Sequence, residues 1–322
     1  MKDSEMGLKN MKKQTTALKA FFQELDLEYE KGGAREAEEF LRKTVDRYSR
    51  CAGGSEEVYI AALSELGGLY RGMGKYAESE KSLLLVQEKI AGRLGTDSME
   101  YATNLNNLAG TYRLMGKTEE ALSCFQKAKS IYERTVGKED YFYAALLNNV
   151  GLLYQRMGEY EKAAHSIETS LAVIEKLGNR EEEAATALTN LGVIYRNLKD
   201  EKKAEESVGK ALEKFKKCAS GSYHLAAANN TMAALLFRKG DFCRAKEYFI
   251  SALGVLKATL GENEEYAICC GSLAFTCLKL GEKKEGEDFA KQAAEIYERL
   301  YGAEHEKTQN AKRMLKGMND IL

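Results

Sequence analysis

The sequence predicts an all-α fold, and three observations support this prediction. The chain of 322 residues contains no proline, so the strongest helix breaker is absent. Apolar residues recur at helical spacing, as in Leu105, Leu108, Ala109 and Tyr112, which gives a helix one apolar face. Glycines recur at nearly constant intervals, and glycine readily ends a helix because it adopts the left-handed conformation without strain. We therefore expect a series of short helices separated by turns.

The glycines divide the chain into intervals of 20 or 21 residues, each long enough for one helix and a turn. The series is interrupted between Gly178 and Gly240, and Lys199 stands there in place of the glycine between two helices of one repeat, which puts that turn's geometry in doubt. The turn glycines are Gly74, Gly95, Gly116, Gly137, Gly158, Gly178, Gly240, Gly261, Gly281 and Gly302. Two such intervals make one repeat.

Three sets of residues keep the same position in every repeat. The core residues of the first helix are 42, 42, 41, 41 and 41 residues apart: Leu66, Leu108, Val150, Leu191, Met232 and Leu273. An aromatic residue or its substitute follows each of them: Tyr70, Tyr112, Tyr154, Tyr195, Leu236 and Cys277. A small residue in the second helix lets the two helices approach closely: Ser79, Ala121, Ala163, Ala204, Ala245 and Gly286. Each repeat is therefore expected to be a closely packed helical hairpin.

This pattern resembles the tetratricopeptide repeat (TPR). The length of the period and the motifs LNNLA, YR and GK resemble the 42-residue variant of this repeat found in kinesin light chains. The resemblance implies a right-handed α-solenoid in which each unit packs on its neighbours. We expect a flexible segment at 1–16 and one solenoid over 17–322. Its parts would be a degenerate repeat at 17–57, six repeats at 59–100, 101–142, 143–183, 184–225, 226–266 and 267–308, and a capping helix at 309–322.

The first helix of each repeat has a second arc, opposite its packing face, that carries polar residues. In the resembled family this arc lines a concave groove that binds peptides. Small residues on the arc, such as Gly68 and Gly110, leave room for a guest. The candidate binding residues are Asn106, Asn107, Asn148, Asn149, Asn190, Asn230, Arg71, Arg113, Arg156, Arg196, Arg238 and Lys279.

Asparagine amides can both donate to and accept from the backbone of an extended peptide, and arginine binds carboxylates in a bidentate manner. We therefore expect a partner segment that is acidic or ends in a free carboxylate. Alternatively, the asparagines hydrogen-bond the neighbouring helix and the arginines only keep the surface soluble. Apolar residues nearer the C-terminus suggest a hydrophobic anchor, unless Phe275 packs against the capping helix: Leu152, Val193, Phe237 and Phe275.

The charge balance excludes a general polyanion-binding surface, because 48 Lys and Arg face 49 Asp and Glu. We expect neither nucleic acid nor membrane as a partner. The N-terminus lacks the apolar core of a signal peptide, no segment is long and apolar enough to span a bilayer, and the seven cysteines include no CxxC pair. These features predict a cytoplasmic protein with reduced thiols.

Neither a catalytic constellation nor a cofactor motif is present. His165, His224 and His305 fall in different repeats, and Cys270 and Cys277 occupy core positions. We therefore expect no enzyme and no cofactor, but a scaffold that binds a peptide segment of a partner protein. The alternative is a peptide-responsive regulator that sequesters a protein. The oligomeric state is open between a monomer and weak self-association.

Overall fold

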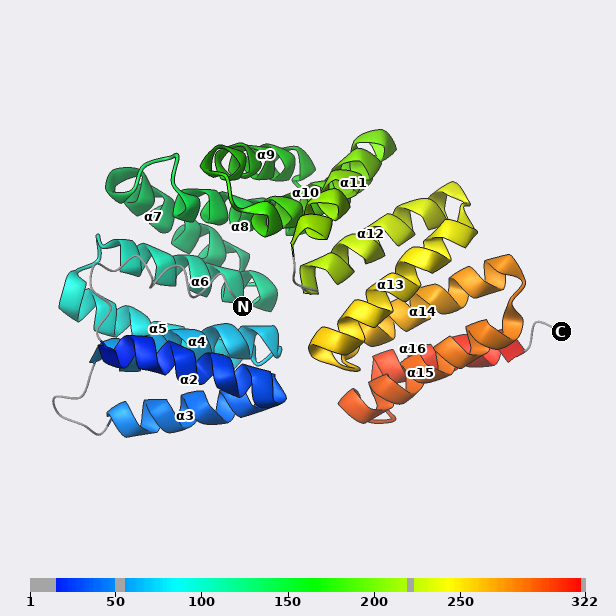
Figure 1. Ribbon diagram of the computed structural model, residues 1–322, viewed down its shortest axis with the longest axis horizontal. Coiled ribbons are helices and arrows are strands. Elements are labelled where there is room, and N and C mark those ends of the chain that lie inside the picture. Colours follow the sequence, from blue (N-terminus) through cyan, green and yellow to red (C-terminus); the bar gives the residue numbers. More distant parts are fainter. Residues whose placement is uncertain (1–15, 50–55, 219–222, 320–322) are drawn as a thin grey trace. The chain divides into compact units, whose positions relative to one another are not determined.

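The computed structural model describes residues 16–49, 56–218 and 223–319, and these residues are almost entirely helical (Figure 1). They form fifteen α-helices and no strand, which confirms the predicted fold class. Residues 1–15 lie outside this range, so the expectation of a flexible N-terminal segment falls outside the described residues. The first described helix begins at Thr16.

The chain divides into two compact units, and the first unit ends at Val173. Each of its helices from α2 to α7 packs on the next along the chain, and the first helices α2, α4, α6 and α8 also contact one another in that order. The helices are α2 (Thr16–Gly32), α3 (Ala34–Ser49), α4 (Glu56–Gly72), α5 (Tyr76–Leu94), α6 (Met99–Met115), α7 (Thr118–Thr135), α8 (Tyr141–Arg156) and α9 (Tyr160–Leu177), within which the unit ends.

The second unit begins at Ile174 and follows the same plan. Each of its helices from α10 onward packs on the next along the chain. They are α10 (Glu181–Asn197), α11 (Glu201–Lys217), α12 (Tyr223–Lys239), α13 (Phe242–Leu260), α14 (Glu264–Leu280), α15 (Lys283–Tyr301) and α16 (Glu306–Asn319). The expectation of a single solenoid over 17–322 stays a prediction.

The turns within repeats share one geometry, whether or not glycine is present. Gly116 has a φ of 80°, and its N–H and that of Lys117 donate to the carbonyls of Arg113 and Tyr112 at 3.3 and 2.9 Å. Lys199 has a φ of 62°, and its N–H and the next one donate to the corresponding carbonyls of α10 at 3.1 and 2.9 Å. The turn at Lys199 is therefore preserved in a conformation that strains a residue with a Cβ atom.

The close packing of paired helices follows from small residues at one position of the first helix. A Cβ atom on Gly151 would lie 2.4 Å from the Ile167 side chain, and one on Gly192 would lie 2.3 Å from Val208. Most of the predicted core residues are buried, whereas Val150 is only partly buried and packs against the core around Phe125. The repeat register read from the sequence therefore places the core correctly.

Candidate functional site

The twelve predicted binding residues all lie on first helices of repeats, but they are divided between the two units. Seven lie in the first unit, on α4, α6 and α8: Arg71, Asn106, Asn107, Arg113, Asn148, Asn149 and Arg156. Five lie in the second unit, on α10, α12 and α14: Asn190, Arg196, Asn230, Arg238 and Lys279. The two groups are therefore described separately.

Within the first unit, asparagines link α6 to α8. The Nδ2 of Asn149 donates to the Oδ1 of Asn106 at 3.1 Å, and both side chains are partly buried. Asn107, the next residue on α6, is also partly buried, and its side-chain amide has no hydrogen-bond partner among the described residues. The alternative of a bond to the neighbouring helix therefore applies to Asn106 and Asn149, and the binding role of the row stays a prediction. The Asn107 side-chain amide makes no such bond to a described residue.

Arg71 extends from α4 to α6. Its Nη1 donates to the backbone carbonyl of Asn107 at 3.1 Å. The same nitrogen lies 3.0 Å from the position that a Cβ atom on Gly110 would occupy, so glycine is what leaves room for the guanidinium. The sequence identified Gly110 only as free space for a ligand. In the structure this glycine makes room for Arg71.

Arg113 lies on α6 with other guanidinium groups near it. Burial, followed by the charges of Arg71 and Arg156, lowers the pKa of Arg113 to about 10, with Tyr76 acting in the opposite direction. Its Nε is buried without a hydrogen-bond partner among the described residues. We name Arg71, Arg113 and Arg156 the arginine row. The row places Arg113 near two other guanidinium groups, and with a pKa of about 10 Arg113 is charged at neutral pH.

In the second unit, most of the corresponding residues already have partners or lie in solvent. The Oδ1 of Asn230 accepts a hydrogen bond from the Cys269 thiol of α14 at 3.1 Å. The exposed Arg238 lies 3.6 Å from a carboxylate oxygen of Glu201 and contributes, after burial, to lowering the pKa of Arg196. The remaining two are Asn190, which is partly buried, and Lys279, which is exposed. This group is less concentrated than the arginine row.

Asn104 is not among the residues that the sequence assigned to the candidate site, and it is more deeply buried than Asn106 and Asn107. Asn104 is 3 % exposed, and its Nδ2 donates to the backbone carbonyl of Leu83 on α5 at 3.0 Å. It thereby joins α6 to the second helix of the preceding repeat. In the sequence, helical periodicity already places Asn104 outside the polar arc that contains Asn106 and Asn107.

Of the suggested hydrophobic anchor, Phe275 is exposed, whereas Leu152, Val193 and Phe237 are partly buried. Phe275 and Ile268, two turns apart on α14, are 51 % and 52 % exposed. The capping helix α16 instead packs Met314 and Leu315 around Ala274 on another side of α14. Phe275 therefore does not pack into the core that α16 covers.

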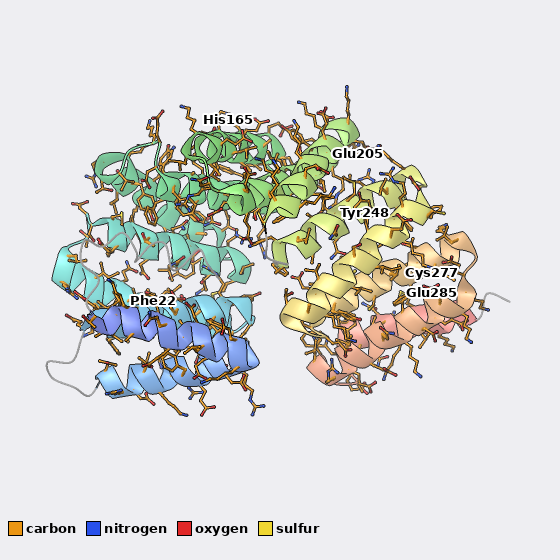
Figure 2. All side chains as sticks on the ribbon, viewed as in Figure 1. Phe22, His165, Glu205, Tyr248, Cys277 and Glu285 are labelled. Atoms are coloured by element: carbon orange, nitrogen blue, oxygen red, sulfur yellow. The ribbon has the colours of Figure 1, made fainter. Side chains whose placement is uncertain are left out.

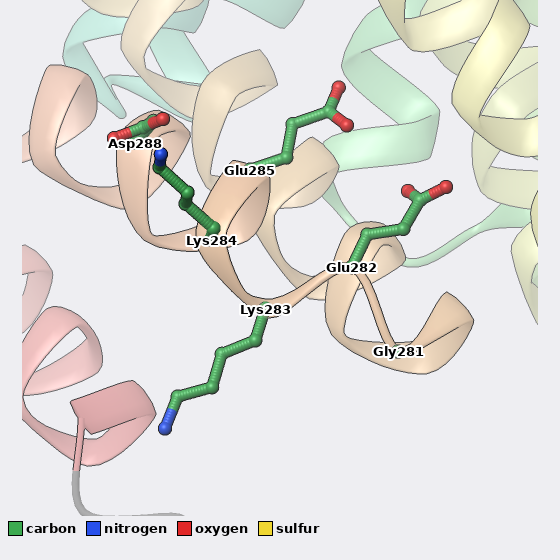
Figure 3. Close-up of a pocket in the computed structure, with 6 residues that line it drawn as sticks. All are labelled: Gly281, Glu282, Lys283, Lys284, Glu285 and Asp288. Atoms are coloured by element: carbon green, nitrogen blue, oxygen red, sulfur yellow. The ribbon is translucent and has the colours of Figure 1, made fainter.

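A cluster in the second unit contains the residue types of a metal site, but a lysine bonds its carboxylates and its thiol is protonated. The thiol of Cys277 and the carboxylates of Glu282 and Glu285 lie within 4.8 Å of one another, next to an open pocket at the start of α15 (Figures 2 and 3). The Nζ of Lys246 donates to both carboxylates at 2.7 Å. Burial raises the pKa of the Cys277 thiol to about 11. The lysine already occupies both carboxylates and offsets one of their two charges, and the thiol is protonated at neutral pH.

The fold and the repeat register agree with the comparisons to known proteins. The tetratricopeptide repeat family model matches residues 58–134, 100–173, 142–217 and 224–299. These matches cover most of the chain, and the protein belongs to the tetratricopeptide repeat family. No match is found among curated proteins. The family prediction is thereby confirmed.

Solved structures show the same fold over most or all of the chain. A Rap protein complexed with competence and sporulation factor has a TM-score of 0.66 at 15 % identity and covers 99 % of this chain and 91 % of its own. A tetratricopeptide repeat protein from Parabacteroides merdae has a TM-score of 0.54 at 19 % identity, covering 94 % and 98 %. BtubC (BKLC) from P. vanneervenii has a TM-score of 0.53 at 25 % identity, covering 62 % and 81 %.

These comparisons define the protein class. Tetratricopeptide repeats form scaffolds for protein–protein interaction and are generally non-catalytic, and no catalytic family matches this chain. None of the described helices combines the length and the apolar character needed to cross a bilayer.

Proposed function

We propose that the protein is a non-catalytic scaffold that binds an extended, acidic or C-terminal peptide segment of a partner protein. The binding surface is the polar arc of α4, α6 and α8 in the first unit, which we name the α6-centred face. It consists of Arg71, Asn106, Asn107, Gly110, Arg113, Asn149 and Arg156. The observation that carries the proposal is the partly buried Asn107, whose side-chain amide makes no hydrogen bond to a described residue and whose carbonyl accepts from Arg71.

The polar groups of this face suit an extended backbone. A peptide chain presents N–H and C=O groups that need partners when they leave water. The Asn107 amide offers two donors and one acceptor, and Asn106 and Asn149 hold each other in place beside it at 3.1 Å. A fixed neighbouring pair lowers the entropy that this face loses on binding.

The charge of the face selects the kind of peptide. The net charge of the whole chain is only −1, so the arginine row is a local positive region in a nearly neutral protein. Such a region favours acidic peptide segments over long polyanions, which need an extended basic surface. Neither nucleic acid, membrane nor cofactor is part of the proposal.

Selected peptides provide the test. Peptides from a random display library would be selected on the full chain and titrated calorimetrically against the wild type and the double variant Asn107→Ala, Asn149→Ala. We expect the affinity to fall by about tenfold or more while helical content is unchanged. Asn197→Ala is the control, because Asn197 is exposed and bonds only its own helix at Val193. Equal losses in both variants, or none, would contradict the assignment of this face.

A second candidate is a regulator that changes shape when it binds a peptide. The Rap structure, whose title names a complex with competence and sporulation factor, covers 99 % of this chain and favours this candidate. Small-angle scattering with and without a selected peptide separates the two functions. A regulator would become more compact on binding. A rigid scaffold would keep its scattering profile.

A further inference from the structure

The last full repeat departs from the polar arc of the other first helices at three positions. At the position of Gly271 the preceding first helices carry a polar residue: Ser64, Asn106, Asn148, Thr189 and Asn230. One turn earlier, Ile268 takes the place of a smaller residue: Ala61, Thr103, Ala145, Thr186 and Ala227. One turn later, Phe275 takes the place of Gly68, Gly110, Leu152, Val193 and Ala234. The arc of α14 thus places a glycine between two large apolar side chains.

Both large side chains are open to solvent. Ile268 is 52 % exposed and Phe275 is 51 % exposed, and they lie two turns, or about 10 Å, apart along α14. Exposed apolar side chains that share one helix face are typical of a contact surface, because water hydrates them at a cost in free energy. By contrast, Ile250 is 47 % exposed and is the only exposed large apolar side chain described on α13. The pair on α14 therefore differs from a single scattered apolar residue.

The capping helix α16 forms a wall beside this pair. A Cβ atom on Gly271 would lie 3.9 Å from the Cε of Met314, and apart from its chain neighbours no other described side chain comes within 4 Å of that point. Lys307, two turns before Met314, donates to the carboxylate of Glu264, which lies two turns before Gly271. The two helices therefore run side by side in the same direction. Gly271 is the floor of a gap that the apolar pair and Met314 surround.

Two cations border this gap without acidic partners. Lys279, one turn beyond Phe275 on the same face, is exposed and forms no ion pair within the described residues. The guanidinium of Arg313 donates to the Oδ1 of Asn310 at 2.7 Å, and it has no carboxylate partner in the described part of the chain. Asn310 lies one turn before Met314, so this hydrogen bond draws Arg313 toward the Met314 side of α16.

The two glutamates that open α14 do not offset these cations, because they are already bonded. Glu264 accepts hydrogen bonds from Lys307 and Tyr301, and Glu265 accepts one from the hydroxyl of Tyr223 at 2.9 Å. The charge that this surface offers to a ligand is therefore positive. Such a surface favours an acidic partner over a basic one.

We propose that one apolar surface of the second unit, the α14–α16 face, binds an amphipathic helix of a partner protein with acidic residues beside its apolar stripe. The face consists of Ile268, Gly271, Phe275 and Met314. A helix presents about one apolar side chain per turn along its stripe, so the middle one of three enters the gap while the outer two contact Ile268 and Phe275. Acidic residues beside the stripe pair with Lys279 and Arg313. This face shares no residue with the α6-centred face and does not depend on its proposed function.

Two display libraries of helical peptides provide the probes. Both have a fixed stripe of apolar residues, one per turn, and the residues beside the stripe are Glu in one library and Lys in the other. The libraries compete for the full chain, and the selected helices are titrated calorimetrically. We expect the Glu library to supply the binders. Adding a binder should shift the NMR signals of the Ile268 δ1 methyl and the Met314 ε methyl.

The decisive variant is Gly271→Asn, which restores a polar residue of the preceding repeats and fills the gap. It should weaken the selected helices about tenfold or more, as should Phe275→Ser, whereas the control Ile250→Ser should leave their affinity within about twofold. The melting temperature of Gly271→Asn should not fall, because its Cβ atom would meet only the end of Met314 at an ordinary contact distance. Asparagine also has a higher helix propensity than glycine. A loss of affinity in this variant is therefore not a loss of fold.

Three results would overturn the site. One is that the selected helices come from the Lys library or that neither library yields a binder. Another is that the selected helices bind Gly271→Asn and Phe275→Ser as tightly as the wild type. The third is a concentration-dependent dimer in analytical ultracentrifugation that Phe275→Ser abolishes, because a second copy would then cover this face. The Asn107→Ala, Asn149→Ala variant should bind the selected helices as the wild type does, so failure here leaves the proposed function standing.

Discussion

The repeat of α6 and α7 and the repeat of α14 and α15 use the same framework for different surfaces. Both have a buried leucine at the core position, Leu108 and Leu273, and a left-handed glycine at the turn. On the polar arc of the first helix, Asn107 corresponds to Ser272 and Gly110 to Phe275. The core also differs, since Tyr112, Ala121 and Phe125 are replaced by Cys277, Gly286 and Ala290. The repeat framework thus tolerates different residues both in its core and on its polar arc.

The difference shows how a repeat protein separates stability from recognition. Large side chains such as Phe125 lie in the contact between α6 and α7, whereas small residues occupy the corresponding positions of α14 and α15, where a Cβ atom on Gly286 would lie 3.0 Å from the carbonyl of Ala274. Neither solution constrains the exposed arc. A polar face on one repeat and an apolar face on the other can therefore coexist in one array.

The largest effect is expected from the core of the polar repeat. Phe125 is 1 % exposed, so Phe125→Ala should lower the free energy of unfolding of the first unit by about 3–5 kcal/mol, through lost burial and a cavity. Urea denaturation with hydrogen exchange of the individual helices measures the loss. A loss below about 1 kcal/mol would mean that α6 and α7 close the gap left by the phenyl ring.

Thiol reactivity should separate the cysteines of the apolar repeat from exposed ones. Burial raises the pKa of Cys270 to about 12 and that of Cys277 to about 11. A raised pKa lowers the thiolate fraction at pH 8, which for Cys277 is about a hundredfold below that of an ordinary thiol. Mass-spectrometric mapping of iodoacetamide labelling should find Cys243, which is exposed, modified first.

The native fold is the cause of this difference, so unfolding should remove it. In concentrated urea all three thiols should be labelled at similar rates, and the labelling of native Cys277 should accelerate as the pH rises toward 11. The test uses a Cys51→Ser background, because Cys51 lies outside the described residues. Native labelling of Cys277 as fast as that of Cys243 would contradict the burial argument.

Substitutions at two turns should change stability by a smaller amount and in opposite directions. Gly116→Ala places a Cβ atom at a φ of 80° and should lower stability by about 1 kcal/mol, whereas Lys199→Gly relieves strain at a φ of 62° and should raise it by up to about 1 kcal/mol. Thermal denaturation compares the two. Gly209→Ala in α11 is the control, since it has an ordinary backbone and open space, and should stabilise the helix.

The sequence predicted the framework better than the site. The glycine spacing and the core register gave the correct fold class, and Cys270 and Cys277 are buried as expected from their core positions. Helical periodicity places a residue on a face, but the offset between neighbouring repeats decides which faces meet. The Asn106–Asn149 bond, the contact of Arg71 with α6 and the burial of Arg113 depend on that offset and could not be read from spacing. The binding role of these residues stays a prediction.

The smallest effect on stability is expected at the exposed face of the apolar repeat. Phe275 is half exposed and outside the core cluster around Ala274, so Phe275→Ser should change the free energy of unfolding by less than about 0.5 kcal/mol. If this side chain anchors a partner, the same variant should weaken an anchored peptide by about tenfold, because an aromatic anchor buries a large apolar area. Thermal denaturation and titration with display-selected peptides measure the two quantities on one variant. A loss of stability without a loss of affinity would show that Phe275 belongs to the framework, and the surfaces of the two repeats would then differ in structure rather than in recognition.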